Sequence, residues 1–224
     1  MYNSINSTYF ALQSTLNMEN NHYLNDITEI KNIMNRSSRF LSLSGLSGVM
    51  AGIYALIGAW FAYQTIYFDY SQLGSYKTLV ISEAALIRLL IIAALVVVLS
   101  IITGVLFSVR KAKKAGENVW DASSRRLIIN LLIPLVTGGI FILFLLEKGM
   151  FGIIAPLTLI FYGLACVNAS KYTLGGVRYL GVTMLILGLI STYFIGYGLL
   201  FWALGFGVCH IIYGGLMYFT HERK

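Results

Sequence analysis

Long apolar runs alternate with short polar connections through most of this chain, and this pattern predicts membrane-spanning helices. About 20 helical residues are needed to cross roughly 30 Å of hydrocarbon. Six runs have a suitable length, and the predicted spans are 41–63, 86–109, 127–146, 150–169, 179–195 and 199–219. Short connections such as 147–149 and 196–198 favour antiparallel pairs. The expected fold is all-α, an integral membrane six-helix bundle built of three antiparallel helical hairpins.

The segment before the first span has a different periodicity, with apolar residues on one helical face and polar residues on the other. The apolar positions are Tyr23, Ile27, Ile30 and Met34. This spacing predicts an amphipathic helix at about 23–36, which can lie on a membrane surface or on another protein. The expected organisation is a cytoplasmic N-terminal segment (1–40), a membrane domain (41–219) and a short cytoplasmic tail (220–224).

Composition supports the membrane assignment. Hydrophobic residues make up 58% of the 224-residue chain, charged residues 11%, and the mean hydropathy is +0.76. A soluble domain averages about 25% charged residues, so this chain has too few polar side chains to cover a water-facing surface. Cys166 and Cys209 both lie inside apolar runs and are expected to be small packing residues rather than a disulfide framework.

The distribution of Lys and Arg predicts the orientation. With both termini in the cytoplasm, thirteen cations fall on inside segments, only Lys77 and Lys148 fall outside, and Arg88 lies near the outer boundary. This is a strong positive-inside bias. It also explains the sequence pI of about 9.4 without nucleic-acid binding. The inside cations are Lys31, Arg36, Arg39, Arg110, Lys111, Lys113, Lys114, Arg125, Arg126, Lys171, Arg178, Arg223 and Lys224.

Small residues form a stripe along the first span at Ser44, Gly48 and Gly52. Such stripes allow close helix packing in lipid, either within the bundle or between two copies in a homo-oligomer. The two prolines, Pro134 and Pro156, both lie inside predicted spans, where each is expected to remove a backbone donor and bend its helix. The third span could open locally after Pro134, as broken helices do in transporters.

Ionisable and polar groups within or beside the spans are the candidate site residues, because burying them in hydrocarbon is costly. His210 is the deepest, and we expect either a ligand or proton role or a hydrogen bond to a neighbour such as Asn168 or Tyr162. Asn130 and Asn168 are expected to bridge helices. Glu83 and Arg88 lie near the outer end of the second span, where they could pair. The complete set is His210, Asn130, Asn168, Arg88 and Glu83.

Motifs for catalysis are missing from the sequence. There is no HExxH, GxSxG or GxxxxGK[ST] pattern, and no Asp or Glu falls clearly at mid-membrane depth. The three histidines are far apart in sequence. We therefore expect no enzymatic activity, no cofactor and no metal site.

Two similar decapeptides precede the first and third spans. Residues 32–41, "NIMNRSSRFL", and 118–127, "NVWDASSRRL", are identical at five of ten positions at an offset of 86. The Ser-Ser pair of each copy is expected to cap its helix. Arg39, Arg125 and Arg126 are expected to anchor anionic lipid headgroups at the cytoplasmic face. A diverged hairpin repeat is one explanation of the match.

Four segments together carry a family resemblance: "SSRFLSLSGLSGVMAGIYALIGA", "WDASSRRLIINLLIPLVTGG", "LIFYGLACVNASKYTLGGVRYLG" and "GYGLLFWALGFGVCHIIYGG". The chain resembles an uncharacterised family of bacterial six-helix multi-pass membrane proteins. The resemblance implies a bacterial cytoplasmic-membrane location. It transfers no catalytic or binding residues.

The expected function is therefore non-enzymatic, with a sensory, regulatory or scaffolding role. The expected partners are the lipid bilayer, its anionic headgroups and a cytoplasmic protein that contacts the N-terminal segment. The alternative is a transporter or channel for a small or lipid-like solute, which would use His210 and the region from Pro134 to Gly139.

Overall fold

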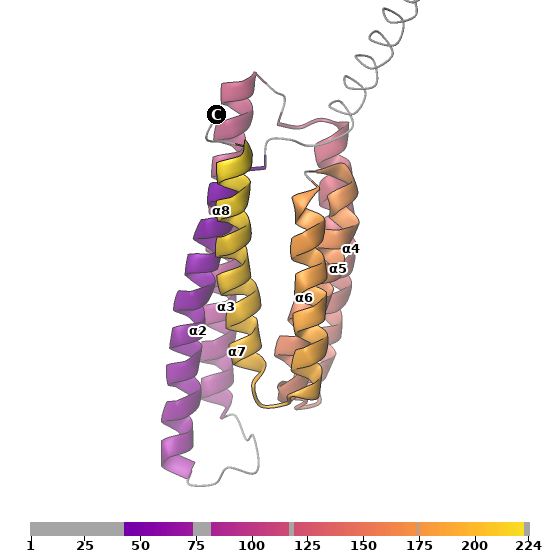
Figure 1. The fold of residues 1–224 in the computed structure, drawn as a ribbon. Helices are drawn as coiled ribbons and strands as arrows, with labels where there is room; N and C mark the ends of the chain where they lie inside the picture. The colour runs from indigo at the N-terminus through magenta and orange to yellow at the C-terminus, as the bar shows by residue number, and fades with distance from the viewer. Residues whose placement is uncertain (1–42, 74–81, 117–118, 174, 222–224) are drawn as a thin grey trace, which may run out of the picture. The chain divides into compact units, whose positions relative to one another are not determined.

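The computed structural model describes residues 43–73, 82–116, 119–173 and 175–221, and these are almost entirely helical (Figure 1). The amphipathic helix expected at 23–36 lies outside the described residues. So does the first of the two decapeptides, with Arg39. The helices are α2 (Gly45–Leu73), α3 (Glu83–Ala115), α4 (Ala122–Glu147), η1 (Phe151–Ile153), α5 (Ile154–Ala169), η2 (Ser170–Tyr172), α6 (Gly176–Tyr193), α7 (Gly198–Trp202), the π-helix η3 (Ala203–Cys209) and α8 (His210–His221).

Six helical segments are long and apolar enough to cross a membrane. They are Gly45–Ile66, Glu83–Ala115, Ala122–Glu147, Phe151–Tyr172, Gly176–Tyr193 and Gly198–Thr220. All six predicted spans are therefore confirmed as helices, with boundaries that differ by a few residues. The chain is a multi-pass membrane protein.

The ends of α3 are set by caps at both termini. The Ser82 hydroxyl accepts a hydrogen bond from the Ala85 backbone amide at 3.2 Å, which satisfies one of the free amides of the first turn. At the other end Gly116 takes a left-handed conformation with φ of 66° and closes the helix. The helix continues past the apolar run because the stretch before Gly116 consists of good helix formers, Lys and Ala.

The start of α4 corrects a prediction. The N-cap is Asp121 and not the Ser-Ser pair: its carboxylate accepts a hydrogen bond from the Ser124 amide at 2.7 Å. The Ser124 hydroxyl in turn accepts a hydrogen bond from the Asp121 backbone amide at 2.9 Å, which completes a capping box. The two serines follow the cap and are buried. The Asp121 carboxylate also places a negative charge at the positive end of the helix dipole, which is favourable.

The helices pack in a chain of neighbours rather than around a single axis. Within the described residues α2 packs against α3 on one side and against η3 and α8 on another, while α5 packs against α4 and α6. The two groups meet where α7 contacts α5 and α6, and where η3 and α8 contact α6. The main partner of α6 is α5 and that of α8 is α2. The organisation into three hairpins therefore stays a prediction.

The small-residue stripe of α2 is used inside the chain. A side chain at Gly52 would come within 2.6 Å of the Gly207 backbone oxygen, and one at Gly48 within 3.2 Å of the Gly214 Cα. Contacts this close need glycine on both helices, because any Cβ would force them apart. The predicted packing role of Gly48 and Gly52 is confirmed. A second copy could reach this face only by displacing α8.

The buried core lies between α5, α6 and η3. Leu159, Leu180 and Met184 form its centre. Gly205 lets η3 approach them, since a Cβ there would meet the Leu159 side chain at 2.4 Å and the Met184 sulfur at 3.0 Å. In lipid there is little hydrophobic drive between helices, so this close packing supplies much of their attraction.

The two prolines differ in their effect on the helices. Pro134 lies inside α4, which is assigned as one helix from Ala122 to Glu147, so the predicted local opening of this span does not occur. Pro156 is the third residue of α5. A proline in the first turn of an α-helix removes an amide that has no partner within that helix. The bends expected at the two prolines stay predictions.

Candidate functional site

His210 is buried and ties α8 to α5. Its Nε2 lies 2.8 Å from the hydroxyl of Tyr162, and its Nδ1 lies 3.2 Å from the backbone oxygen of Gly205. The side chain is 6% exposed. The expected hydrogen bond to a neighbour is therefore confirmed, with Tyr162 rather than Asn168 as the partner.

The geometry assigns the tautomer of His210. A carbonyl oxygen can only accept, so Nδ1 carries the hydrogen and donates it to Gly205. In a neutral imidazole Nε2 is then an acceptor, and the Tyr162 hydroxyl donates to it. Both ring nitrogens and the tyrosine hydrogen are satisfied by the neutral ring. Neither ring nitrogen of His210 is therefore left without a hydrogen-bond partner.

A π-helix and an aromatic cluster place the imidazole. The η3 segment directly precedes His210 and carries Gly205, so the carbonyl five residues back comes within reach of the ring. Phe206 stacks on the imidazole with centroids 5.9 Å apart and planes 16° apart. Tyr162 contacts Phe206 at 5.0 Å, and Trp202 contacts Phe206 at 5.0 Å from the other side. Sequence periodicity assumes 3.6 residues per turn and gives no sign of this π-helix.

The Asn168 side chain bridges α5 to α4, as predicted, and Pro134 explains why its partner is the Asn130 backbone. Without an amide hydrogen, Pro134 leaves the carbonyl of the residue four positions earlier, Asn130, without its helical donor. The Asn168 side chain of α5 donates to that carbonyl at 2.9 Å. The Asn130 side-chain amide donates to the Arg126 oxygen of its own helix at 2.8 Å, so the helix bridge predicted for the Asn130 side chain does not form. Each residue was identified in the sequence, but the link through Pro134 was not.

These two polar contacts are separate. Tyr162 and Asn168 are six residues apart on α5, which places them roughly 9 Å apart along the axis and about 240° around it. One therefore points toward α8 and the other toward α4. The predicted residues His210, Asn130 and Asn168 act as two bridges from α5 and do not converge on one ligand.

Glu83 and Arg88 lie in the first two turns of α3 and are both exposed. In the described part of the chain no ion pair joins them. Five helical residues separate positions by 500°, or about 140° around the axis, so the two side chains leave from different faces. The suggested pair does not form.

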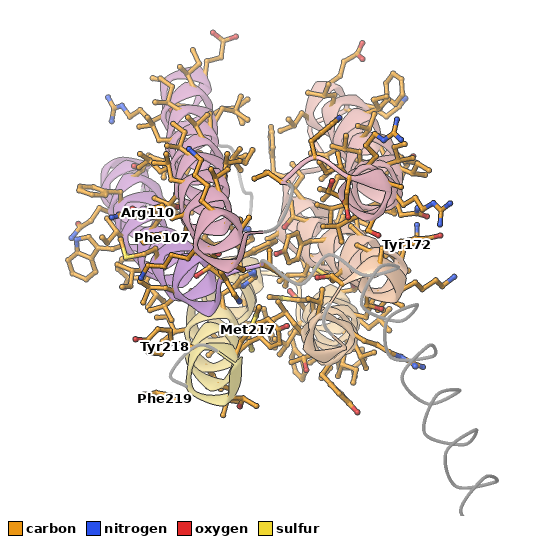
Figure 2. The ribbon with its side chains drawn as sticks, turned by 90° about the horizontal axis from the view of Figure 1, so that it is seen from above. Phe107, Arg110, Tyr172, Met217, Tyr218 and Phe219 are labelled. Atoms are coloured by element: carbon orange, nitrogen blue, oxygen red, sulfur yellow. The ribbon has the colours of Figure 1, made fainter. Side chains whose placement is uncertain are left out.

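The end of the domain seen in Figure 2 is rich in cations. Arg125 and Arg126 are exposed at the fourth and fifth residues of α4, and Arg110 is exposed near the end of α3. Lys111 differs, because its ammonium donates to the Leu43 oxygen at 2.8 Å and so joins α3 to the start of α2. A cation in a first helical turn opposes the helix dipole at a cost of about 0.3–1 kcal/mol. Arg125 and Arg126 therefore favour an anion at this end.

Two buried hydroxyl groups have no hydrogen-bond partner in the described structure, those of Tyr213 and Ser191. Tyr213 is one turn from His210 on α8, and its hydroxyl approaches Gly176 at the start of α6. Among the described residues, no three His, Cys, Asp or Glu side chains gather as metal ligands would. Both cysteines are free.

The fold and these contacts define an all-helical multi-pass membrane protein whose described interior polar groups mostly join one helix to another or bond within their own helix. Comparison with known proteins adds no relative: no family model, no curated protein and no solved structure matches the chain.

Proposed function

We propose that this chain is a non-enzymatic multi-pass protein of the bacterial cytoplasmic membrane with a regulatory or scaffolding role. Its helices would form a fixed framework, and the cytoplasmic N-terminal segment would contact a protein partner. The observation that supports this most is that the side chains of His210 and Asn168 bond to neighbouring helices within the chain. Polar groups committed to holding helices together are not free to bind a solute.

The N-terminal segment supplies the testable element. Its predicted apolar stripe includes Ile27 and Ile30, and its polar face includes Asn25 and Asn32. Deletion of residues 1–35 should abolish the cellular phenotype that depends on this protein, or the cross-link to its protein partner. The six spans should still insert into the membrane. Ile27→Ser with Ile30→Ser should reproduce the loss, whereas Asn25→Ser with Asn32→Ser, on the other face, should not. An unchanged phenotype after the deletion would refute this function.

The orientation within the membrane is part of the proposal, and the uneven distribution of Lys and Arg supports it. In a Cys166→Ala, Cys209→Ala background, Lys148→Cys should react with an impermeant maleimide on intact cells. Lys113→Cys should react only after the cells are permeabilised. Both lysines are exposed in the structure, so access of the reagent reports the side of the membrane. The reverse labelling pattern would contradict the proposed orientation in the membrane.

A transporter or channel is the second candidate, and one observation favours it. The buried Tyr213 hydroxyl has no partner, although it lies one turn from His210. A solute or water passing between α5 and α8 would give it one. Cys166 is 3% exposed on α5 and lies beside Tyr162, so it can act as a native probe. In a Cys209→Ala variant, rapid reaction of Cys166 with a small hydrophilic thiol reagent would support this candidate, and no reaction over hours would exclude it.

A further inference from the structure

The helices α3 and α4 are consecutive but expose almost all of their apolar surface. In the most hydrophobic stretch of α3 no residue is buried, and in that of α4 only 6% of the residues are buried. Among the described residues α3 packs against α2, α4 packs against α5 and η2, and the two share at most isolated contacts. Because these two consecutive helices do not pack against each other, their apolar faces are left for another molecule to cover.

Cations stand directly beside these faces. Residues 110–126 carry six Lys and Arg and two Asp and Glu, a formal net charge of +4 (6 − 2). On α4, Arg125 is exposed one turn before Ile129, which is 57% exposed. On α3, Arg110 is exposed one turn after Leu106, which is 58% exposed. The junction therefore offers positive charge and uncovered hydrocarbon within a single helical turn.

Among the described residues, no carboxylate forms an ion pair with Arg125 or Arg126. Asp121 is occupied in the capping box with Ser124. Arg125 and Arg126 stand at the positive end of the α4 dipole, where a cation is unfavourable unless an anion is present. Trp120 is 67% exposed beside them, and an indole prefers the headgroup layer.

We propose that an anionic phospholipid of the bilayer binds at the α3–α4 junction. Its phosphate would contact Arg125 and Arg126, and its acyl chains would lie along the exposed faces of α3 and α4. Only a ligand that is anionic at one end and apolar along its length matches both features. A second copy of this chain would bring another positive junction against the first. A soluble acidic partner would leave the apolar faces uncovered.

The test uses Trp120 as the probe. In a Trp60→Phe, Trp202→Phe chain reconstituted in bilayers, quenching by brominated phosphatidylglycerol is compared with quenching by brominated phosphatidylcholine. About 1 kcal/mol per basic residue at the surface corresponds to about fivefold in affinity, so two arginines give up to about 25-fold preference for the anionic lipid. Arg125→Gln with Arg126→Gln should lower the preference by up to this factor.

The matched control removes two other exposed cations from the same end, Lys171→Gln with Arg178→Gln, which flank the tightly packed α5–α6 pair. This variant should keep the preference at Trp120. Equal loss in both variants, or loss in neither, would overturn the proposal. Competition by millimolar glycerol phosphate would show a headgroup site without lipid and would also overturn it. Mass spectrometry of lipids retained by the chain with all tryptophans present should show the same selective loss.

Discussion

The contact between Asn168 and the carbonyl freed by Pro134 can be tested with a double-mutant cycle. Asn168→Ala removes the amide that donates to the Asn130 oxygen at 2.9 Å. Pro134→Ala restores a backbone amide that can donate to the same oxygen along α4. In the Pro134→Ala background the carbonyl already has a donor, so removal of the Asn168 amide leaves no unsatisfied acceptor. The two changes should therefore not be additive.

The size of this effect follows from the environment of the bond. A buried acceptor without a partner costs about 1–3 kcal/mol. Side-chain bonds between membrane helices are weaker on average, about 0.6 kcal/mol with a maximum of about 1.7. The Asn168 bond is partly buried and serves an otherwise unpaired carbonyl, so we expect the upper part of that range, about 1–1.7 kcal/mol, with Pro134 present. In the Pro134→Ala background the cost should fall by about 1 kcal/mol.

The measurement is reversible unfolding of the purified protein in mixed micelles by titration with a denaturing detergent. Four proteins are compared: the parent, each single variant and the double variant. The cavity left by Asn168→Ala is common to both backgrounds, so it cancels in the cycle. Additive changes, within about 0.3–0.5 kcal/mol, would show that Asn168 does not replace the donor lost at Pro134.

Three further predictions use the same assay. Tyr162→Phe should lower the free energy of unfolding by about 0.6–1.7 kcal/mol, because it leaves Nε2 of the buried imidazole without a donor. Tyr193→Phe, at a side chain that is 84% exposed, should have no effect. Equal effects of the two variants would refute the tyrosine–histidine bond. Gly214→Ala should cost about 1–3 kcal/mol because its Cβ would lie 2.6 Å from α2 backbone atoms, but Gly104→Ala should be neutral or stabilising because no atom lies within 4 Å. Asp121→Ala should cost about 1 kcal/mol through loss of the capping box, and Asp121→Asn should recover most of that loss.

One polar contact has a cause that is local in the sequence, although the sequence predictions did not include it. A proline inside a span frees a carbonyl four residues earlier, and this rule involves only Pro134 and Asn130. Identifying Asn168 as the donor requires knowing that α5 lies beside α4 and which of its faces is turned inward. For His210 the sequence offered Asn168 and Tyr162 as possible partners, and only the structure chose Tyr162, which is 48 residues away. The second partner, the Gly205 oxygen, depends on a π-helix that the sequence does not indicate.

The N-cap of α4 shows a different reason for error. Ser123, Ser124 and Asp121 all have side chains that can cap a helix, and they lie within four residues. Choosing among them requires the position at which the backbone turns into the helix. In the structure that turn places Asp121 at the cap and Ser124 three residues later.

The sequence by itself determined that this protein has six helices long and apolar enough to cross a membrane, because both hydropathy and backbone hydrogen bonding within a helix are local properties. It also marked the small residues that allow close packing. The tertiary structure decided which helices meet: Gly48 and Gly52 face α8, and α5 joins α4, α6 and α8. The physical reason is that lipid surrounds helices that are apolar on every side. No amphipathic pattern then directs one face inward, and the choice of partner depends on shape complementarity and a few polar bonds between residues distant in the chain.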